Sequence, residues 1–331
     1  EMLNQAASDP QVVSIRQTLY RTGADSGVAN ALLKAARAGK DVLVVIELRA
    51  RFDEAANIEL ANALQAAGAQ VVYGVVGHKP HAKMGRILRR EGRRLGRYVH
   101  LGTGNYHERT ARAYTDYGLL SSDQELGQDV QKIFQQIAAL GKAGKLKAIL
   151  QSPFTLHSGV LELIEIQRQK ALQGQPALIQ AKMNALTEPS VIRALYGASQ
   201  AGVHIDLIIR GICCLRPGVK GVSENIRVRS IVGRFLEHMR VYCFGVDEER
   251  EVFLSSADWM DRNLFRRVEA CFPVRDPVLA KRVYREAMSH YLSDNTQAWE
   301  LTSDGSYRKL KSRGKAHTAQ GALLMDLTEH S

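Results

Sequence analysis

Short, uninterrupted apolar runs alternate along the chain with longer segments in which apolar residues recur at helical spacing. Residues 12–20 (VVSIRQTLY), 41–48 (DVLVVIEL) and 70–76 (QVVYGVV) predict strands, and the run at 41–48 has the continuous apolar character of a buried parallel strand. Between them, segments 26–40 and 54–69 predict helices, since their apolar residues recur every three or four positions and a glycine lies near each end. This alternation predicts an α/β layered domain.

After residue 81 the pattern becomes that of an antiparallel sheet. Residues 82–90 (AKMGRILRR) and 94–105 (RLGRYVHLGTGN) predict two strands joined by a turn at Glu91–Gly92. A helix is predicted near 124–140, and the following polar stretch GKAGKLKA is typical of a linker. We therefore predict a first domain at residues 1–150 and a second at 151–331. The polar stretch from Trp299 onward is predicted to form a helix and a frayed tail.

The second half of the chain repeats landmarks of the first. Residues 41–47 (DVLVVIE) match 204–210 (HIDLIIR), and each run follows a helix that ends in Ala-Gly. Polar residues then pair in the same order on this register: Arg21 with Asn184, His81 with His238, Lys83 with Arg240, Asn105 with Asp258, and Asp116 with Glu269. A duplicated α/β domain is the economical explanation.

The excess of basic over acidic residues indicates which class of molecule the protein binds. The formal net charge of this 331-residue chain is +11, which favours a polyanion such as nucleic acid, an acidic membrane surface or polyphosphate. No apolar run is long enough to span a membrane, and the four cysteines show no metal-type spacing. We expect reduced thiols in apolar strands of a cytoplasmic protein.

Two such domains facing each other would bring two histidines, Lys83, Arg240, Asn105 and Asp258 into one shared site. Residues i and i+2 of a strand point to the same face, so His81 and Lys83 can contact one phosphate together. This set suits transfer of a phosphoryl or phosphodiester group. One histidine attacks phosphorus, the other protonates the leaving oxygen, and the cations and the amide neutralise charge on the remaining oxygens.

These residues carry a resemblance. A repeated His-x-Lys or His-x-Arg followed by a small-residue turn resembles the phospholipase D superfamily. The longer segments LYRTGADS, ELRARFDEAANI, HKPHAKM, YVHLGTGNYHERTARAYTDYGLL, LIIRGICCLRPGVKGVSENIRVRSIVGRFLEHMRVY and LSSADWMDRN are similar to the first, histidine-phosphorylating class of bacterial polyphosphate kinases. The resemblance implies two phospholipase D-like α/β domains. It also implies reversible transfer of the terminal phosphate of ATP to inorganic polyphosphate.

The same resemblance implies roles for individual residues. His81 would become phosphorylated, and His238 would assist proton transfer or contact the nucleotide. Tyr114 and Arg210 resemble positions that contact ATP. Arg21 and Arg51 resemble a pair assigned to the Mg²⁺–phosphate site. Because arginine has no lone pair for a metal, we interpret that pair as clamps on the phosphates that hold Mg²⁺.

Several alternatives stay open. Arg21 and Arg51 could instead form ion pairs, Tyr114 could be a packing aromatic, and Glu269 could be a structural partner of a histidine. The wider superfamily has an aspartate shortly after His-x-Lys, whereas MGRIL follows here, which favours the kinase over a diesterase.

A phospholipase D-like phosphodiesterase and a non-catalytic polyanion-binding module remain as alternative functions. The resemblance begins inside the family's length, so the amino-terminal domains are expected to be missing partners of this chain. The family further implies a homo-oligomer, loose association with membranes and no specific nucleic acid.

Overall fold

The computed structural model describes residues 1–20, 26–47, 54–74, 78–139, 144–312 and 314–329, which form two compact units. Unit 1 comprises Glu1–Arg112, Tyr117–Phe154 and Arg266–Ala270. Unit 2 comprises Ala113–Asp116, Thr155–Phe265 and Cys271–Ser331. Each unit therefore includes a short segment from the other half of the sequence. The domain ranges 1–150 and 151–331 stay a prediction.

A six-stranded sheet forms the centre of unit 1, in the order β3-β2-β1-β5-β6-β8. Its strands are β1 (Val12–Leu19), β2 (Asp41–Ile46), β3 (Gln70–Tyr73), β5 (Lys83–Glu91), β6 (Arg94–Gly102) and β8 (Gly118–Ser121). The first three strands are parallel, and β5 is antiparallel to β1. The predicted β-α-β-α-β order and the hairpin at Glu91–Gly92 are both confirmed.

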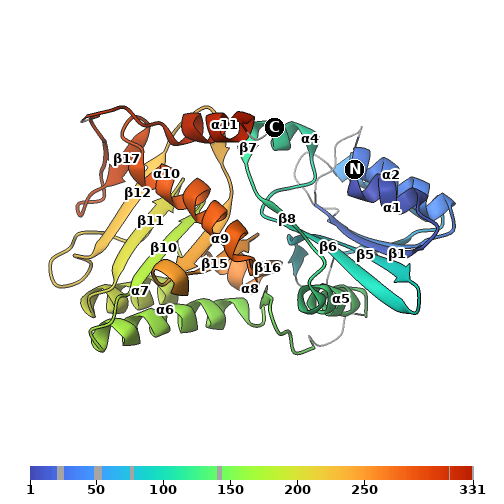
Figure 1. The fold of residues 1–331 in the computed structure, drawn as a ribbon, viewed down its shortest axis with the longest axis horizontal. Helices are drawn as coiled ribbons and strands as arrows, with labels where there is room; N and C mark the ends of the chain where they lie inside the picture. The colour runs from blue at the N-terminus through green and yellow to red at the C-terminus, as the bar shows by residue number, and fades with distance from the viewer. Residues whose placement is uncertain (21–25, 48–53, 75–77, 140–143, 313, 330–331) are drawn as a thin grey trace. The chain divides into compact units, whose positions relative to one another are not determined.

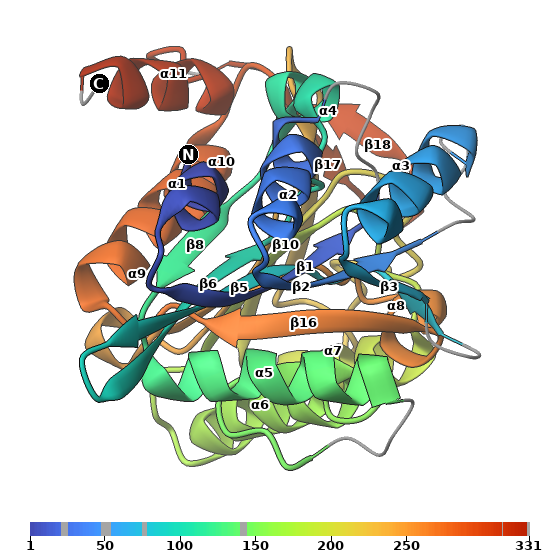
Figure 2. The ribbon, with the colours of Figure 1, turned by 90° about the vertical axis from the view of Figure 1, so that its right-hand side faces the viewer.

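Helices cover both faces of this sheet (Figure 2). One face carries α1 (Met2–Ser8), α2 (Gly27–Arg37) and α3 (Glu54–Ala66), and the other carries α5 (Gln124–Ala139). Apolar side chains of the first face, including Ile15 on β1 and Ile87 on β5, pack with α1–α3 in one core cluster. Burial of this cluster stabilises unit 1 through the hydrophobic effect.

Unit 2 contains a second mixed sheet, in the order β18-β17-β12-β11-β10-β14-β15-β16. Its strands are β10 (Leu178–Met183), β11 (His204–Ile209), β12 (Ile226–Ile231), β14 (Arg240–Phe244), β15 (Glu251–Ser255), β16 (Arg267–Pro273), β17 (Ala298–Leu301) and β18 (Tyr307–Lys309). Only the end of β16, from Cys271 on, belongs to unit 2, and its earlier residues belong to unit 1. Helices α6 (Leu156–Leu172) and α7 (Pro189–Gln200) cover one face, and α9 (Pro277–Tyr284), the π-helical turn η2 (Arg285–Ser289) and α10 (His290–Ser293) cover the other (Figure 1). Pro189 begins α7 at a position where its missing N–H costs nothing.

The two units share one topology. The order β3-β2-β1-β5-β6-β8 of unit 1 has a direct counterpart in β12-β11-β10-β14-β15-β16, with the same parallel and antiparallel neighbours. In this match β5 corresponds to β14, and these strands begin at Lys83 and Arg240. The prediction of duplicated α/β domains is therefore confirmed.

The remaining elements are short. They are β4 (Lys79–Pro80), α4 (Glu108–Ala113), β7 (Tyr114–Thr115), β9 (Leu150–Ser152), β13 (Leu236–Glu237), the 3-10 turn η1 (Asp247–Glu249), α8 (Asp261–Phe265) and α11 (Ala319–Glu329). No helix in the described ranges combines the length and the apolar character needed to cross a bilayer.

Three details differ from the sequence-based expectations. The stretch from Trp299 contains the expected helix, α11, but also an antiparallel pairing of β17 with β18. Lys79–Pro80, where no strand was predicted, pairs in parallel with Arg267–Val268 at the start of β16. Proline is tolerated there because β4 lies at the end of the strand order. Cys243 and Cys271 are buried as expected, but Cys214 is exposed.

Candidate active site

The backbone around His81 is anchored from two sides within unit 1. The backbone N–H groups of His81 and Ala82 donate to the carbonyl of Val268, at 2.9 and 2.8 Å. The hydroxyl of Thr18 on β1 donates to the carbonyl of Ala82 at 2.7 Å and accepts from the N–H of Met84 at 3.0 Å. These bonds hold the start of β5 in place, so the imidazole is presented by rigid backbone.

The His81 ring lies in a chain of polar contacts that assigns its two nitrogens. Nδ1 lies 2.8 and 2.9 Å from the two carboxylate oxygens of Glu269, whose side chain is fully buried. Nε2 lies 3.0 Å from Nζ of Lys83. An ammonium group donates and cannot accept, and an ionised carboxylate only accepts. The contacts therefore favour the tautomer with the proton on Nδ1 and a lone pair on Nε2.

The surroundings of His81 keep water away from most of the ring. Its side chain is 9% exposed, and Lys83 is buried. The edge of Tyr20 packs against the imidazole at 5.1 Å between ring centroids, and Nζ of Lys83 lies 5.6 Å from the centre of the same tyrosine ring. In a dry setting the charges of Lys83 and Glu269 act on the ring more strongly than they would in water.

His238 forms a second centre in unit 2. Its Nδ1 lies 2.9 Å from both carboxylate oxygens of Asp116, whose side chain is 21% exposed. The ring of Tyr114 lies 5.1 Å from the imidazole, and the hydroxyl of Thr115 accepts from the backbone N–H of His238 at 3.2 Å. The segment that carries these three residues, Ala113–Asp116, belongs to unit 2.

Each histidine thus takes its carboxylate from the opposite repeat. Glu269 of the second repeat contacts His81 of the first, and Asp116 of the first contacts His238 of the second. The sequence register pairs the two carboxylates, but their exchange between repeats appears first in the structure. The sequence analysis considered Glu269 as a structural partner of a histidine. In the structure its carboxylate contacts Nδ1 of His81.

Arg240 is fixed by a buried carboxylate beside His238. Its Nε and Nη2 lie 3.2 Å from Oδ1 and Oδ2 of Asp258, and its Nη1 donates to the carbonyl of His238 at 2.7 Å. Asp258 also accepts from the backbone N–H of Asn184 at 2.8 Å. Burial by itself raises the pKa of Asp258, but the charge and hydrogen bonds of Arg240 and the contacts of Asn184 outweigh it, so the pKa lies below its usual value.

A buried polar cluster next to His238 escaped the sequence analysis. Nζ of Lys182 on β10 forms an ion pair with Glu237 at 2.6 Å and lies 3.0 Å from the centre of the Tyr291 ring. The hydroxyl of Tyr291 and the side-chain amide of Gln320 both donate to Glu237. Burial lowers the pKa of Lys182 to about 8, against the opposing charge of Glu237. The repeat register pairs Lys182 with Leu19, so comparison of the two repeats did not indicate a functional lysine at this position. A lysine within a strand that is otherwise apolar was the signal in the sequence that could have indicated this buried cluster.

The other predicted site residues divide into three groups. Arg210 donates to the carbonyl of Glu237 at 2.8 Å and so lies beside the His238 centre. Asn105 follows the turn after β6, and its side-chain oxygen is buried without a hydrogen-bond partner. Arg21 and Arg51 lie outside the described residues. The expectation that both histidines serve one shared site stays a prediction.

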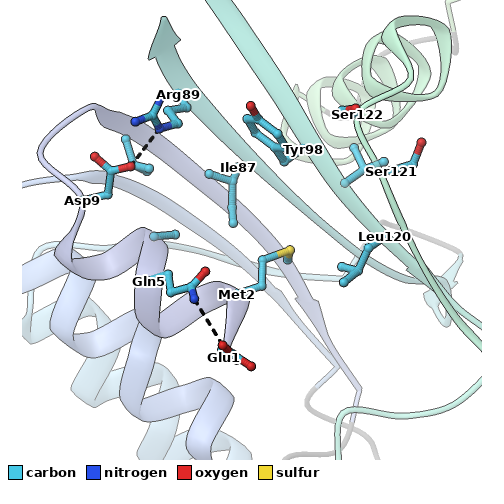
Figure 3. A pocket seen from close by; sticks show the side chains of 13 residues that line it. Glu1, Met2, Gln5, Asp9, Ile87, Arg89, Tyr98, Leu120, Ser121 and Ser122 are labelled. Atoms are coloured by element: carbon cyan, nitrogen blue, oxygen red, sulfur yellow. Dashed lines mark hydrogen bonds and ion pairs between the residues drawn. The ribbon is translucent and has the colours of Figure 1, made fainter. Parts of the chain in front are cut away.

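A hollow of about 620 Å³ opens elsewhere in unit 1 (Figure 3). It is lined by residues of α1, β5, β6 and β8, among them Met2, Ile87 and Leu120. Of the predicted site residues that the structure describes, none lines it. Arg89 at its margin is bonded to Asp9 at 2.8 Å. We assign no role in the chemistry to this hollow.

Family comparison supplies independent findings. A family model described as "Polyphosphate kinase C-terminal domain 1" matches residues 1–143, and one described as "Polyphosphate kinase C-terminal domain 2" matches residues 149–320. The chain is 62% identical over 329 residues to a polyphosphate kinase of Xylella fastidiosa, covering 99% of this chain and 47% of that protein. It is 57% identical to one of Pseudomonas aeruginosa, covering 48% of it. The chain therefore spans about half the length of these relatives.

Two solved structures are similar to this one. The crystal structure of polyphosphate kinase from Porphyromonas gingivalis matches with a TM-score of 0.91 at 38% identity, covering 99% of this chain and 50% of that chain. Phosphatidylserine synthase from Haemophilus influenzae matches with a TM-score of 0.57 at 12% identity, covering 99% of this chain and 90% of that chain. The second likeness concerns the fold alone.

Proposed function

Because the chain belongs to the polyphosphate kinase family, we propose that it carries the centre for reversible transfer of the terminal phosphate of ATP to inorganic polyphosphate, with His81 as the phosphorylated residue. The observation that supports this most directly is the contact chain Glu269–His81–Lys83. It combines a ring nitrogen with a lone pair, a carboxylate behind the ring, and a cation where phosphate oxygens would arrive.

In the first step Nε2 of His81 attacks the terminal phosphorus of ATP. The lone pair forms the N–P bond, the P–O bond to ADP breaks, and its electron pair leaves with the ADP oxygen. The ring gains positive charge as the bond forms, and the carboxylate of Glu269 at Nδ1 stabilises that charge. Lys83 must release Nε2 at this moment, and its ammonium group is then placed to bind an oxygen of the transferred phosphoryl group.

In the second step an oxygen at the end of a polyphosphate chain attacks the same phosphorus. The new P–O bond forms while the N–P bond breaks, and the electron pair returns to Nε2. His81 is the nucleophile in the first step and the leaving group in the second. Each step interconverts a phosphoanhydride and a phosphohistidine, so the sequence can run in either direction. The surplus of basic residues, +11 overall, favours the approach of both polyanionic substrates.

The His238 centre serves proton transfer and the nucleotide in this proposal. Nδ1 of His238 faces Asp116, and its Nε2 lies 3.2 Å from Nη1 of Arg240. Nε2 exchanges a proton with a phosphate oxygen once that guanidinium turns to the phosphate. Tyr114 offers an aromatic ring beside His238 for a base or ribose, and Arg210 contributes a half-buried guanidinium. Burial lowers the pKa of Arg210, with the nearby Arg240 acting in the same direction, so an anion here would be attracted by two cations.

Magnesium enters this proposal on the phosphates of ATP, as part of the substrate. Family resemblance places it with Arg21 and Arg51, whose side chains can bind phosphate but offer a metal no lone pair. In the ranges that the structure describes, no three His, Cys, Asp or Glu side chains are arranged to hold a metal ion. The side chains of Arg21 and Arg51 do not suit a Mg²⁺ ion bound directly by the protein, and we assign no reaction step to such an ion.

Three broader expectations are also proposals. The remaining half of the relatives' length would supply further contacts to the nucleotide, the assembled protein would form a homo-oligomer, and it would be cytoplasmic with loose membrane association. Sedimentation of this chain joined to the remaining length of the Xylella fastidiosa relative tests the second of these.

The central experiment is labelling with ATP that carries radioactive terminal phosphate, in the presence of Mg²⁺. We use this chain and the same hybrid with the Xylella fastidiosa relative. The proposal requires acid-labile, base-stable label on the hybrid, which chases into polyphosphate on addition of polymer and back into ATP on addition of ADP.

His81→Ala removes the label, and His78→Ala, three residues earlier, is the matched control that retains it. Unchanged labelling of His81→Ala in the hybrid, or turnover of a phosphodiester without ATP, would overturn the proposal. Binding of polyphosphate without any labelling would support a non-catalytic module instead.

A further inference from the structure

Three arginines gather on the face of the unit 1 sheet that α5 covers. Arg16 on β1 lies directly opposite Arg86 on β5 in the antiparallel register, and Arg97 on β6 lies diagonally from Arg86 on the same face. Like charges directly opposite each other destabilise a sheet. Arg86 lies three residues after Lys83 on the same strand, so the two side chains point to opposite faces and this cluster lies away from the His81 centre.

Arg86 is the least compensated member of the cluster. Its side chain is 5% exposed, its Nη2 donates to the hydroxyl of Ser14 at 3.0 Å, and its Nε is buried without a hydrogen-bond partner among the described residues. Burial, together with the charges of Arg16 and Arg97 and against that of Asp41, lowers the pKa of Arg86 to about 10. A guanidinium in such surroundings has a strong need for an anion.

The carboxylates around this cluster are bound to other groups. Asp41 is bidentate to Arg16, at 2.9 and 2.5 Å, and its side chain is half exposed. Asp129 on α5 accepts from the backbone N–H groups of residues 147–149. The amide oxygen of Gln131 accepts from Arg97 at 3.1 Å. These contacts leave the buried charge of Arg86 without a carboxylate in direct contact in the described part of the chain.

An open volume lies beside Arg86. A hollow of about 450 Å³ is lined by residues of β1, β2, β3 and β5 on one side and of α5 on the other, and both Arg16 and Arg86 line it. Its wall also holds the hydroxyl of Ser14, three glutamine amides and the carboxylate of Asp41 that is bonded to Arg16. The hydroxyl, the amides and the guanidinium groups are donors of the kind that bind a tetrahedral oxyanion.

We propose that this hollow between the unit 1 sheet and α5 is a phosphate-binding site, in which Arg86 and Arg16 hold a phosphate oxyanion apart from the phosphoryl-transfer centre. Nε of Arg86, which has no hydrogen-bond partner in the described ranges, can donate to one phosphate oxygen, and the guanidinium of Arg16, shared with Asp41, adds positive charge beside it. The same chemistry serves a free inorganic phosphate or one phosphate of a polyphosphate chain. In either case the anion removes the repulsion between Arg16 and Arg86, so its binding stabilises unit 1.

Titration calorimetry of the 331-residue chain with inorganic phosphate, and separately with tripolyphosphate, tests this site at fixed ionic strength. Arg86→Met should weaken one binding event by at least about tenfold and leave any binding at the His81 centre in place. Arg90→Met is the matched control, because Arg90 is exposed on the same strand and the change in net charge is identical. Tighter binding of tripolyphosphate that also depends on Arg86 would identify the polymer as the ligand, and equal affinity would identify free phosphate.

Thermal unfolding without added anion provides a second readout. Arg86→Met removes a buried, uncompensated charge, so without anion its melting temperature should equal or exceed that of the parent chain. Added phosphate should raise the melting temperatures of the parent and of Arg90→Met by more than it raises that of Arg86→Met. Should Arg86→Met fail to fold, Arg16→Met must weaken the same binding event. Phosphate binding that neither substitution changes would overturn the proposal.

Discussion

The two histidine centres stand on equivalent strands of a duplicated sheet, yet they are built differently. In unit 1 Glu269 is fully buried behind His81, and the cation Lys83 contacts Nε2 of the ring itself. In unit 2 Asp116 behind His238 is 21% exposed. Nη1 of Arg240 also contacts Nε2 of its histidine, at 3.2 Å, but this guanidinium is held in addition by the carboxylate of Asp258 and the carbonyl of His238. The two centres therefore share the same strand framework. They differ in how deeply the carboxylate behind the histidine is buried and in which groups hold the cation.

The difference teaches how one motif can support two kinds of chemistry. In the proposed reaction, the buried carboxylate behind His81 would stabilise the positive ring that forms on phosphorylation. The partly hydrated carboxylate behind His238 would suit a group that exchanges protons with its surroundings. The predictions below probe this contrast, from the largest expected effect to the smallest.

The first prediction concerns Glu269. Glu269→Gln keeps the shape of the side chain but removes the negative charge behind His81, so the rate of His81 labelling should fall by about 10³- to 10⁴-fold. Single-turnover labelling with ATP measures this rate. An equal loss in Asp116→Asn would contradict the contrast between the centres.

The second prediction concerns the buried pair of unit 2. Asp258→Asn leaves the guanidinium of Arg240 buried without its carboxylate, so the free energy of unfolding should fall by about 3 kcal/mol. Urea denaturation followed by circular dichroism measures the change. Glu162→Gln, on an exposed residue of α6 in the same unit, is the control and should change it by less than about 0.5 kcal/mol.

The third prediction concerns the cation beside the nucleophile. Lys83→Met removes the ammonium group from Nε2 of His81 and from the incoming phosphate, so the labelling rate should fall by about 100-fold. Lys83→Arg restores the charge but not the length and shape, and it should recover part of the loss. Full activity of Lys83→Met would exclude a contact with the transferred group.

The fourth prediction concerns pH and unit 1. Burial lowers the pKa of His100 to about 4, from 6.5, and its Nδ1 lies 2.7 Å from the hydroxyl of Tyr106. The unfolded state binds a proton at this residue between pH 6.5 and about 4 while the folded state does not, so stability falls as the pH falls through this window. The loss should reach about 2 kcal/mol near pH 4.

His100→Asn should flatten the acid side of the stability profile in denaturation experiments at several pH values. His204→Asn, on an exposed residue of unit 2, is the control. A profile unchanged by His100→Asn would show that other groups carry the acid sensitivity.

The smallest effect is expected at Asp116. Asp116→Asn should lower the rate of polyphosphate synthesis by about tenfold, because the imidazole of His238 loses the carboxylate that holds it through Nδ1. Steady-state rates of synthesis at saturating ATP and polyphosphate measure this loss.

The repeat in the sequence was sufficient to find the histidines, their cations and the shared topology. Apolar runs and helical spacing identified β1, β2 and β3 with α2 and α3 between them, because a strand buried on both faces and a helix packed on one face leave distinct periods. The register that paired His81 with His238 also paired Asp116 with Glu269. Local pattern cannot show β17 and β18, whose pairing depends on distant partners and whose residues are largely polar.

Sequence alone determined the duplicated α/β plan and the identity of both histidines, since each depends on patterns that repeat along the chain. Tertiary structure alone decided which carboxylate lies behind which histidine, because Glu269 and Asp116 belong to units other than those of their own repeats. It also decided the Lys182–Glu237 pair and the uncompensated charge of Arg86. Burial and contact between distant segments set the protonation and the partners of a side chain, and neither can be read from its neighbours in sequence.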